Sequence, residues 1–256
     1  MPPPVSIVTN SKTALGKAIV RRLAFAGHKV AAVDTCKGSV AAIAEDNRKV
    51  GTLVTGVAVD LAIDSNRKEL VERVVKEFGG LDSLILVPPS NCLRGDILDT
   101  STQQFEAMFE HFLTIPFRVV QAAVPTLKLS ENPSIVMVSS SAGYAPQIDG
   151  GMHSVVSTSI LGMVKALAQN VAKDKIRVNG VSTGMVEGDG SGAVWDNLSK
   201  NEQQEQIKQN LQSMIPLGRL GRPSDVASLV EFLLSDRAKY VTGENLIVNG
   251  GVSFRI

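Results

Sequence analysis

Residues 215–227 read Ile-Pro-Leu-Gly-Arg-Leu-Gly-Arg-Pro-Ser-Asp-Val-Ala, and two further motifs follow them, Tyr240-Val241-Thr242-Gly243 and Val248-Asn249-Gly250-Gly251. Upstream of this stretch, short β-rich runs alternate with longer segments of helical period. Such alternation is typical of stacked βαβ units and of a mostly parallel sheet covered on both faces. We therefore predict a doubly wound α/β fold, with strands at residues 5–9, 29–34, 53–60, 83–87, 134–139, 176–181 and 245–249.

Apolar residues recur at helical spacing between these predicted strands. One stripe lies between an expected N-cap at Asp64 and the pair Gly79-Gly80, and it consists of Leu70, Val74 and Phe78. A second stripe has spacings of three and four and consists of Val156, Ile160, Val164, Leu167 and Val171. We expect both helices to pack against the sheet.

Length and charge limit the organisation and the partners of the chain. The 256 residues, 44% of them apolar, suit one domain over residues 1–256 with one long connection, a possible mobile lid at 184–200. The formal charge of +1 comes from 26 basic and 25 acidic residues without a run of one sign. We expect neither nucleic acid nor a membrane as a partner.

The cysteines and the chain ends bear on the cellular compartment. Only Cys36 and Cys92 occur, which is too few for a disulfide framework, and no His/Cys cluster suggests a metal site. The start, Met1-Pro2-Pro3-Pro4, has no signal-peptide pattern. We expect a cytoplasmic protein, with the peroxisome as an alternative because Phe254-Arg255-Ile256 loosely resembles a peroxisomal tripeptide.

The motifs quoted first, together with Lys175-Ile176-Arg177-Val178-Asn179 and Ser139-Ser140-Ser141-Ala142-Gly143, resemble the short-chain dehydrogenase/reductase family in the same order. The resemblance covers nearly the whole chain and is nearest to the carbonyl-reductase-like branch. It implies a Rossmann-type fold with seven parallel strands. It also implies a nicotinamide dinucleotide and a catalytic set of Ser, Tyr, Lys and Asn, whose positions we compare one by one.

The family's phosphate loop reads Thr-Gly-x-x-x-Gly-Ile-Gly, whereas this chain reads Thr9-Asn10-Ser11-Lys12-Thr13-Ala14-Leu15-Gly16. Asn10 tolerates a left-handed conformation, but Ala14 places a methyl group where the dinucleotide should approach the backbone. Lys12 either meets a phosphate or is a solvated residue in a plain strand–turn–helix joint. If a cofactor binds, the resemblance assigns it to Thr9, Asn10, Lys12, Leu15 and Gly16 of this loop.

Two acidic residues end predicted strands. Asp34 lies where an acidic residue would bind the adenine ribose, which favours NAD over NADP, and its alternative is a role as a strand-end turn residue. Asp60 lies where the family has an acidic residue near the adenine, or it simply forms a turn. The family's Asn-Asn-Ala-Gly turn is replaced by residues 86–89, where Pro88 and Pro89 lack a backbone N–H. We expect that no cofactor binds, and that NAD is favoured if one does.

The catalytic positions also differ from the family pattern. The Tyr and Lys positions, one helical turn apart, hold His153 and Ser157, while the family Ser is present as Ser140. The Asn position holds Phe112, whose helical spacing with Met108 predicts a core aromatic. His153 either shuttles protons in place of the phenol or is a tolerated polar residue at the rim of the cleft. The family's later Thr position, after the sixth strand, holds Gly188.

The first functional hypothesis is a catalytically impaired paralogue that acts by binding or assembly. It would form a homo-oligomer, a dimer or tetramer, or a hetero-oligomer with an active relative, through helices that contain residues 122–124 and 155–171. The alternative is a weak NAD(H)-dependent carbonyl reductase or alcohol dehydrogenase that uses Ser140 and His153. A third hypothesis is a protein that binds a small ligand in the cleft.

Overall fold

A seven-stranded parallel sheet forms the centre of the computed structural model, which describes residues 2–90, 93, 95–146, 150–188, 209–210 and 212–252. The strand order β3-β2-β1-β4-β5-β6-β7 confirms the doubly wound α/β prediction. Predicted and observed strand ends differ by at most two residues. The strands are β1 (Val5–Val8), β2 (Lys29–Asp34), β3 (Val54–Ala58), β4 (Ser83–Leu86), β5 (Ser134–Ser140), β6 (Arg177–Thr183) and β7 (Asn245–Val248).

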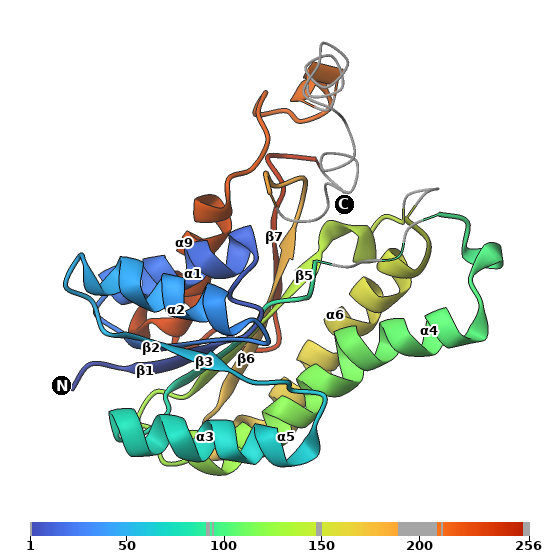
Figure 1. Cartoon of the computed structure of the whole chain (residues 1–256). Coiled ribbons are helices and arrows are strands. Elements are labelled where there is room, and N and C mark those ends of the chain that lie inside the picture. Colours follow the sequence, from blue (N-terminus) through green and yellow to red (C-terminus); the bar gives the residue numbers. More distant parts are fainter. Residues whose placement is uncertain are drawn as a thin grey trace.

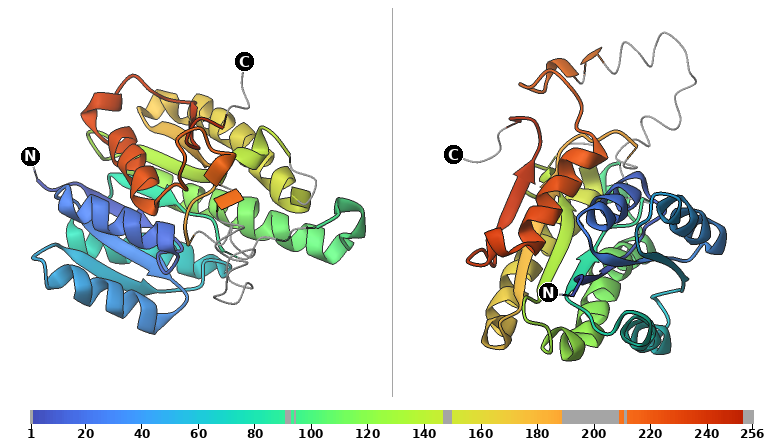
Figure 2. Two further views of the ribbon diagram at one scale, coloured as in Figure 1. Left: turned by 90° about the horizontal axis from the view of Figure 1, so that it is seen from above. Right: turned by 90° about the vertical axis from the view of Figure 1, so that its left-hand side faces the viewer.

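Helices cover both faces of this sheet (Figures 1 and 2). Because successive strand residues point to opposite faces, Ile135 of β5 packs in one apolar cluster and Val136 in the other. The first cluster involves α3 (Asp64–Phe78), α5 (Ile115–Leu127) and α6 (Gly151–Val171). The second involves α1 (Ala14–Phe25), α2 (Lys37–Arg48) and α9 (Pro223–Leu234).

Helix α3 shows one small error in the sequence prediction. Gly79 ends the helix in a left-handed conformation at φ 95°, as the Gly79-Gly80 pair predicts. The N-cap is Ile63, however, and not Asp64, which is the first helical residue and forms an ion pair with the buried Arg67. The Asp64 carboxylate therefore pairs with Arg67, one turn later, and does not cap the amides at the start of the helix.

A π-helical turn joins two helices into one rod that extends beyond the sheet (Figure 1). The rod consists of α4 (Thr102–Phe109), the π-turn Glu110–Thr114 and α5. Pro116 has no N–H to donate to the carbonyl of Phe112, and Ile115 N–H bonds to the carbonyl of Glu110, five residues earlier. The short 3₁₀ segments are Ile97–Asp99, Ser141–Gly143, Ala172–Asp174 and Asp236–Ala238.

Helix α6 with the turn after it, Gly151–Asp174, is the one described helix long and apolar enough to cross a membrane. Length and composition alone are weak evidence, because the core helix of a globular protein passes the same test. Only 33% of its most apolar stretch is buried within the chain. The other residues of this stretch are half-buried or exposed.

Candidate functional site

The carboxyl ends of the parallel strands meet at one edge of the sheet, where the β1–α1 turn begins. Asn10 has a left-handed backbone, φ 49°, which Asn adopts more readily than most residues. Its side-chain amide donates to the Val87 carbonyl at 2.6 Å, and Thr9 Oγ1 accepts from Val87 N at 3.1 Å. These bonds tie the first turn to the segment after β4.

Thr13 caps helix α1, a role that the motif comparison missed. Its Oγ1 accepts from Gly16 N at 2.9 Å and donates to the Asn10 carbonyl at 3.0 Å. A Thr directly before a helix is a recognised start signal and could have been read from the sequence. A Cβ on Gly16 would lie 2.5 Å from Asn10 O and 2.7 Å from Ser11 Cα. Glycine is therefore required at position 16 by the packing of the turn.

The segment after β6 crosses the N-terminus of α1. Gly188 is left-handed, φ +70°, and a Cβ on it would lie 3.0 Å from the Ala14 methyl carbon. The segment is held by two backbone bonds of Gly221, which accepts from Glu187 N at 2.9 Å and donates to Met185 O at 2.9 Å. Of the lid expected at 184–200, residues 184–188 take this path and the rest lie outside the described residues.

Asp34 at the end of β2 is buried and accepts several hydrogen bonds from the chain itself. Its carboxylate receives the backbone N–H groups of Lys12, Thr35 and Cys36 at 3.1, 2.9 and 3.3 Å. Lys12 Nζ lies 3.4 Å from Oδ1. Lys12 thus forms an ion pair with Asp34, and both carboxylate oxygens have donors within the protein.

Next to this pair, Cys36 is exposed at the N-terminus of α2. Hydrogen bonds from Ser39 lower the pKa of its thiol, and the charge of Lys12 adds a smaller effect in the same direction. Cys92 lies outside the described residues. Among the described residues, no group of three His, Cys, Asp or Glu side chains could hold a metal ion.

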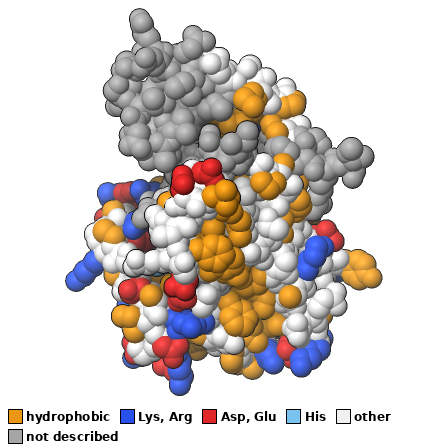
Figure 3. Space-filling model, turned by 90° about the vertical axis from the view of Figure 1, so that its right-hand side faces the viewer, with side chains coloured by type: hydrophobic (Ala, Val, Ile, Leu, Met, Phe, Trp, Pro, Cys, Tyr) orange, Lys and Arg blue, Asp and Glu red, His pale blue; other side chains and the backbone are white. Residues whose placement is uncertain are grey.

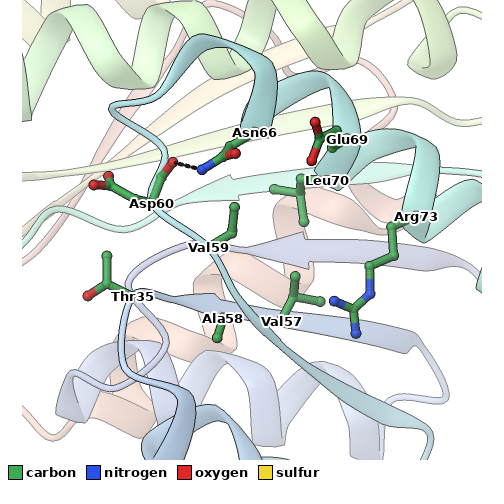
Figure 4. A pocket seen from close by; sticks show the side chains of 9 residues that line it. All are labelled: Thr35, Val57, Ala58, Val59, Asp60, Asn66, Glu69, Leu70 and Arg73. Atoms are coloured by element: carbon green, nitrogen blue, oxygen red, sulfur yellow. Dashed lines mark hydrogen bonds between the residues drawn. The ribbon is translucent and has the colours of Figure 1, made fainter.

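Asp60, at the end of β3, has the local bonds of a turn residue. Its Oδ1 accepts from Ala62 N at 2.9 Å, and its carbonyl accepts from the Asn66 side chain at 2.8 Å (Figure 4). The same residue lines a pocket of about 450 Å³ between β3 and α3, together with Thr35, Val57, Ala58, Val59, Asn66, Glu69, Leu70 and Arg73.

Ser140, His153 and Ser157 lie around the junction of β5 and α6. Ser140 is half-buried at the end of β5, and its Oγ accepts from Ala142 N at 3.2 Å. His153 is half-buried in the first turn of α6. Ser157 is only 2% exposed, and its carbonyl accepts from Ser139 Oγ at 3.2 Å.

The backbone packs tightly around Ser157. A Cβ on Gly143 would lie 2.9 Å from the carbonyl carbon of Ser157 and 2.9 Å from the nitrogen of Thr158. Phe112 is 4% exposed and is a core residue, as its spacing with Met108 predicts. It belongs to a small apolar cluster with Met108, Met152 and Val156.

Comparisons with known proteins agree with this architecture. Residues 10–253 match the family model described as enoyl-(acyl carrier protein) reductase. The chain is 32% identical to human "Dehydrogenase/reductase SDR family member 4", over 98% of this chain and 88% of the relative. It is also 32% identical to "Tropinone reductase-like 3" of Erythroxylum coca, over 98% and 94%. The fold matches a mutant short-chain dehydrogenase/reductase of Serratia marcescens with a TM-score of 0.85 at 23% identity, over 98% of both chains.

Proposed function

The chain belongs to the short-chain dehydrogenase/reductase family, and we propose that it is a catalytically impaired member that acts by assembly. The observation that carries the proposal is the burial of Ser157, one helical turn after His153 on α6. An acid–base group works efficiently when its pKa is tuned towards the working pH. Ser157 places no cation beside His153 at the position where the family has its Lys.

The cofactor positions support the same proposal, because they fit a dinucleotide poorly. The pyrophosphate of a dinucleotide would need free space beside the backbone at position 14. The methyl group of Ala14 occupies part of that space and faces Gly188. A ribose would require a free Asp34 carboxylate, yet that carboxylate is buried and paired with Lys12. Each mismatch weakens affinity, and independent losses add as free energies.

The exposed apolar side chains of α4 and α5 favour assembly, either with a second copy or with an active relative. Phe105 and Phe117 are 43% and 40% exposed, and Figure 3 shows apolar side chains gathered along the face towards which these helices lie. Contiguous apolar surface of this kind is typical of protein interfaces. Sedimentation velocity of Phe117→Glu should show dissociation, whereas Leu129→Glu, at an 84% exposed position beyond α5, should leave the assembly intact.

A weak carbonyl reductase or alcohol dehydrogenase remains the second candidate, because Ser140 is retained at the end of β5 and the relatives are dehydrogenases and reductases by name. Titration calorimetry with NADH and NADPH separates the two functions. Impairment predicts dissociation constants above about 100 μM for both nucleotides. Binding of either in the low micromolar range would overturn our proposal and support the reductase.

A further inference from the structure

Strand β3 is an edge strand, the last in the order of the sheet. Its hydrogen bonds with β2 run from Val30 N to Leu53 O and from Val59 N to Asp34 O, both at 2.9 Å. In a parallel pair, alternate residues bond towards the same neighbour. Residues 53, 55, 57 and 59 therefore face β2, and residues 54, 56 and 58 direct their N–H and C=O groups away from the sheet.

The residues of this strand include none of the charged side chains or prolines that usually prevent an edge strand from pairing with another strand. Residues 54–58 read Val-Thr-Gly-Val-Ala, without a charge or a proline. Ala58 is exposed, and Thr55 and Gly56 are half-buried, so the edge reaches the surface. Proteins that avoid pairing at a sheet edge usually place Lys, Pro or a bulge there. This edge can accept another strand.

The pocket of about 450 Å³ lies directly beside this edge, between β3 and α3 (Figure 4). Its larger apolar side chains are Val57 of the strand, Val59 directly after the strand and Leu70 of the helix. Side chains of an added strand alternate between the two faces of the sheet. One side chain of such a strand would therefore be directed towards the pocket.

The charges around the pocket indicate which strand would fit. Asp60 and Glu69 are exposed at its rim, Glu77 accepts a hydrogen bond from Thr55 nearby, and Arg73 is the single cation among these four residues. The local charge is thus negative. A segment with basic residues beside an aliphatic one is complementary to this surface.

We propose that the free edge of β3 binds an extended segment of a partner protein by strand addition. An aliphatic side chain of that segment enters the pocket beside α3, and its basic side chains lie against Asp60 and Glu69. Main-chain hydrogen bonds to residues 54, 56 and 58 supply affinity, and the pocket and its rim supply specificity. The inference does not depend on whether the chain is catalytically impaired.

The test uses a capped peptide of alternating Lys and Val, added to the full-length protein. Fluorescence polarisation should give a dissociation constant of about 10–500 μM that weakens with salt. Hydrogen exchange read by NMR should show new protection of the amides of Val54, Gly56 and Ala58. Absence of saturable binding, or binding without protection of these amides, would overturn the proposal.

Three substitutions locate the binding surface. Glu69→Lys should weaken binding of the basic peptide at least about fivefold, because it reverses a rim charge. Glu72→Lys, which makes the same charge change at an exposed position of α3 outside the pocket, should change binding less than twofold. Ala58→Pro removes one outward N–H from an edge strand that tolerates proline, and it should also weaken binding. Equal effects of Glu69→Lys and Glu72→Lys would refute the pocket as the binding surface.

Discussion

Lys12 Nζ lies 3.4 Å from Asp34 Oδ1, so a salt bridge joins the turn after β1 to the end of β2. The two partners are not equally buried, since the Lys12 side chain is 50% exposed and the Asp34 side chain 2%. The Asp34 carboxylate also accepts three backbone N–H groups. The carboxylate thus organises both turns, and Lys12 contributes mainly its charge.

This asymmetry predicts unequal mutational effects. Lys12→Ala should lower the free energy of unfolding by less than about 1 kcal/mol, because a half-exposed ion pair is screened by water. Asp34→Ala should cost about 2 kcal/mol, because it leaves three part-buried backbone N–H groups without their acceptor. Urea denaturation measures both. Equal losses would show that the ion pair, and not the backbone bonds, stabilises the turns.

Gly16→Ala should destabilise the protein by about 1–3 kcal/mol, because the new Cβ meets the backbone of Asn10 and Ser11. Gly38→Ala in the first turn of α2 is a matched control. A Cβ at Gly38 meets nothing within 4 Å, so this variant should be stabilised by roughly 0.5–1 kcal/mol. Thermal unfolding measures both variants, and a Gly16→Ala protein as stable as the parent would contradict the geometry.

His28 predicts a dependence of stability on pH. Burial lowers the pKa of its imidazole below 6.5, although the negative charges of Asp82 and Glu231 act in the opposite direction and raise it. The Nδ1 atom of His28 lies 2.8 Å from Ser6 Oγ. The folded state therefore favours neutral His28. This contribution to stability is fully present above the unfolded pKa of 6.5 and is lost as pH falls through the lower folded pKa.

The free energy of unfolding should accordingly decrease between about pH 7 and pH 5. His28→Gln should flatten this decrease, whereas His111→Gln, at an exposed position of the π-turn, should leave it unchanged. Urea titrations at several pH values measure the slope. An unchanged slope in His28→Gln would show that other groups cause it.

We expect no detectable turnover of diketones or aromatic aldehydes with NADH, and no rescue by a single substitution. His153→Tyr alone gives a phenol with an ordinary pKa near 10 and leaves Ser157, which has no charge, at the family's Lys position. Adding Ser157→Lys supplies the cation, but Ala14→Gly and Asn10→Gly should also be required, since residues that act as a unit lose function together. If the parent protein turns over at about 1 s⁻¹ or faster and His153→Ala abolishes the activity, the impairment proposal is wrong.

Ser157→Lys also needs a test of folding in this series. Because Ser157 is buried, the substitution should destabilise the protein by about 1–3 kcal/mol. Gln169→Lys, at an exposed position of the same helix, should have little effect. Circular dichroism and thermal unfolding of both variants show whether an inactive variant lacks catalytic groups or has failed to fold.

The sequence predicted the sheet well because strand residues such as Ile135 and Val136 must be apolar when both faces are covered. Residues 53–60 were predicted as too long a strand, since apolar residues continue beyond the last residue that pairs with β2. The Lys12–Asp34 pair could not be predicted, because it depends on how two turns 22 residues apart meet in space. The path of Gly188 over Ala14 depends in the same way on tertiary structure. The peroxisome alternative rests on Phe254-Arg255-Ile256, and this tripeptide lies outside the described residues.

The π-turn that precedes Pro116 allows α4 and α5 to form one continuous helix that packs in two different apolar clusters. An additional residue in a helix rotates the following side chains by about 100° around the axis. Met108 before the turn and Phe112 within it pack in the small cluster with α6, and after the turn Val119 and Val120 pack in the main cluster on the sheet. The continuous helix thus presents a different apolar face on each side of the π-turn, without an intervening loop.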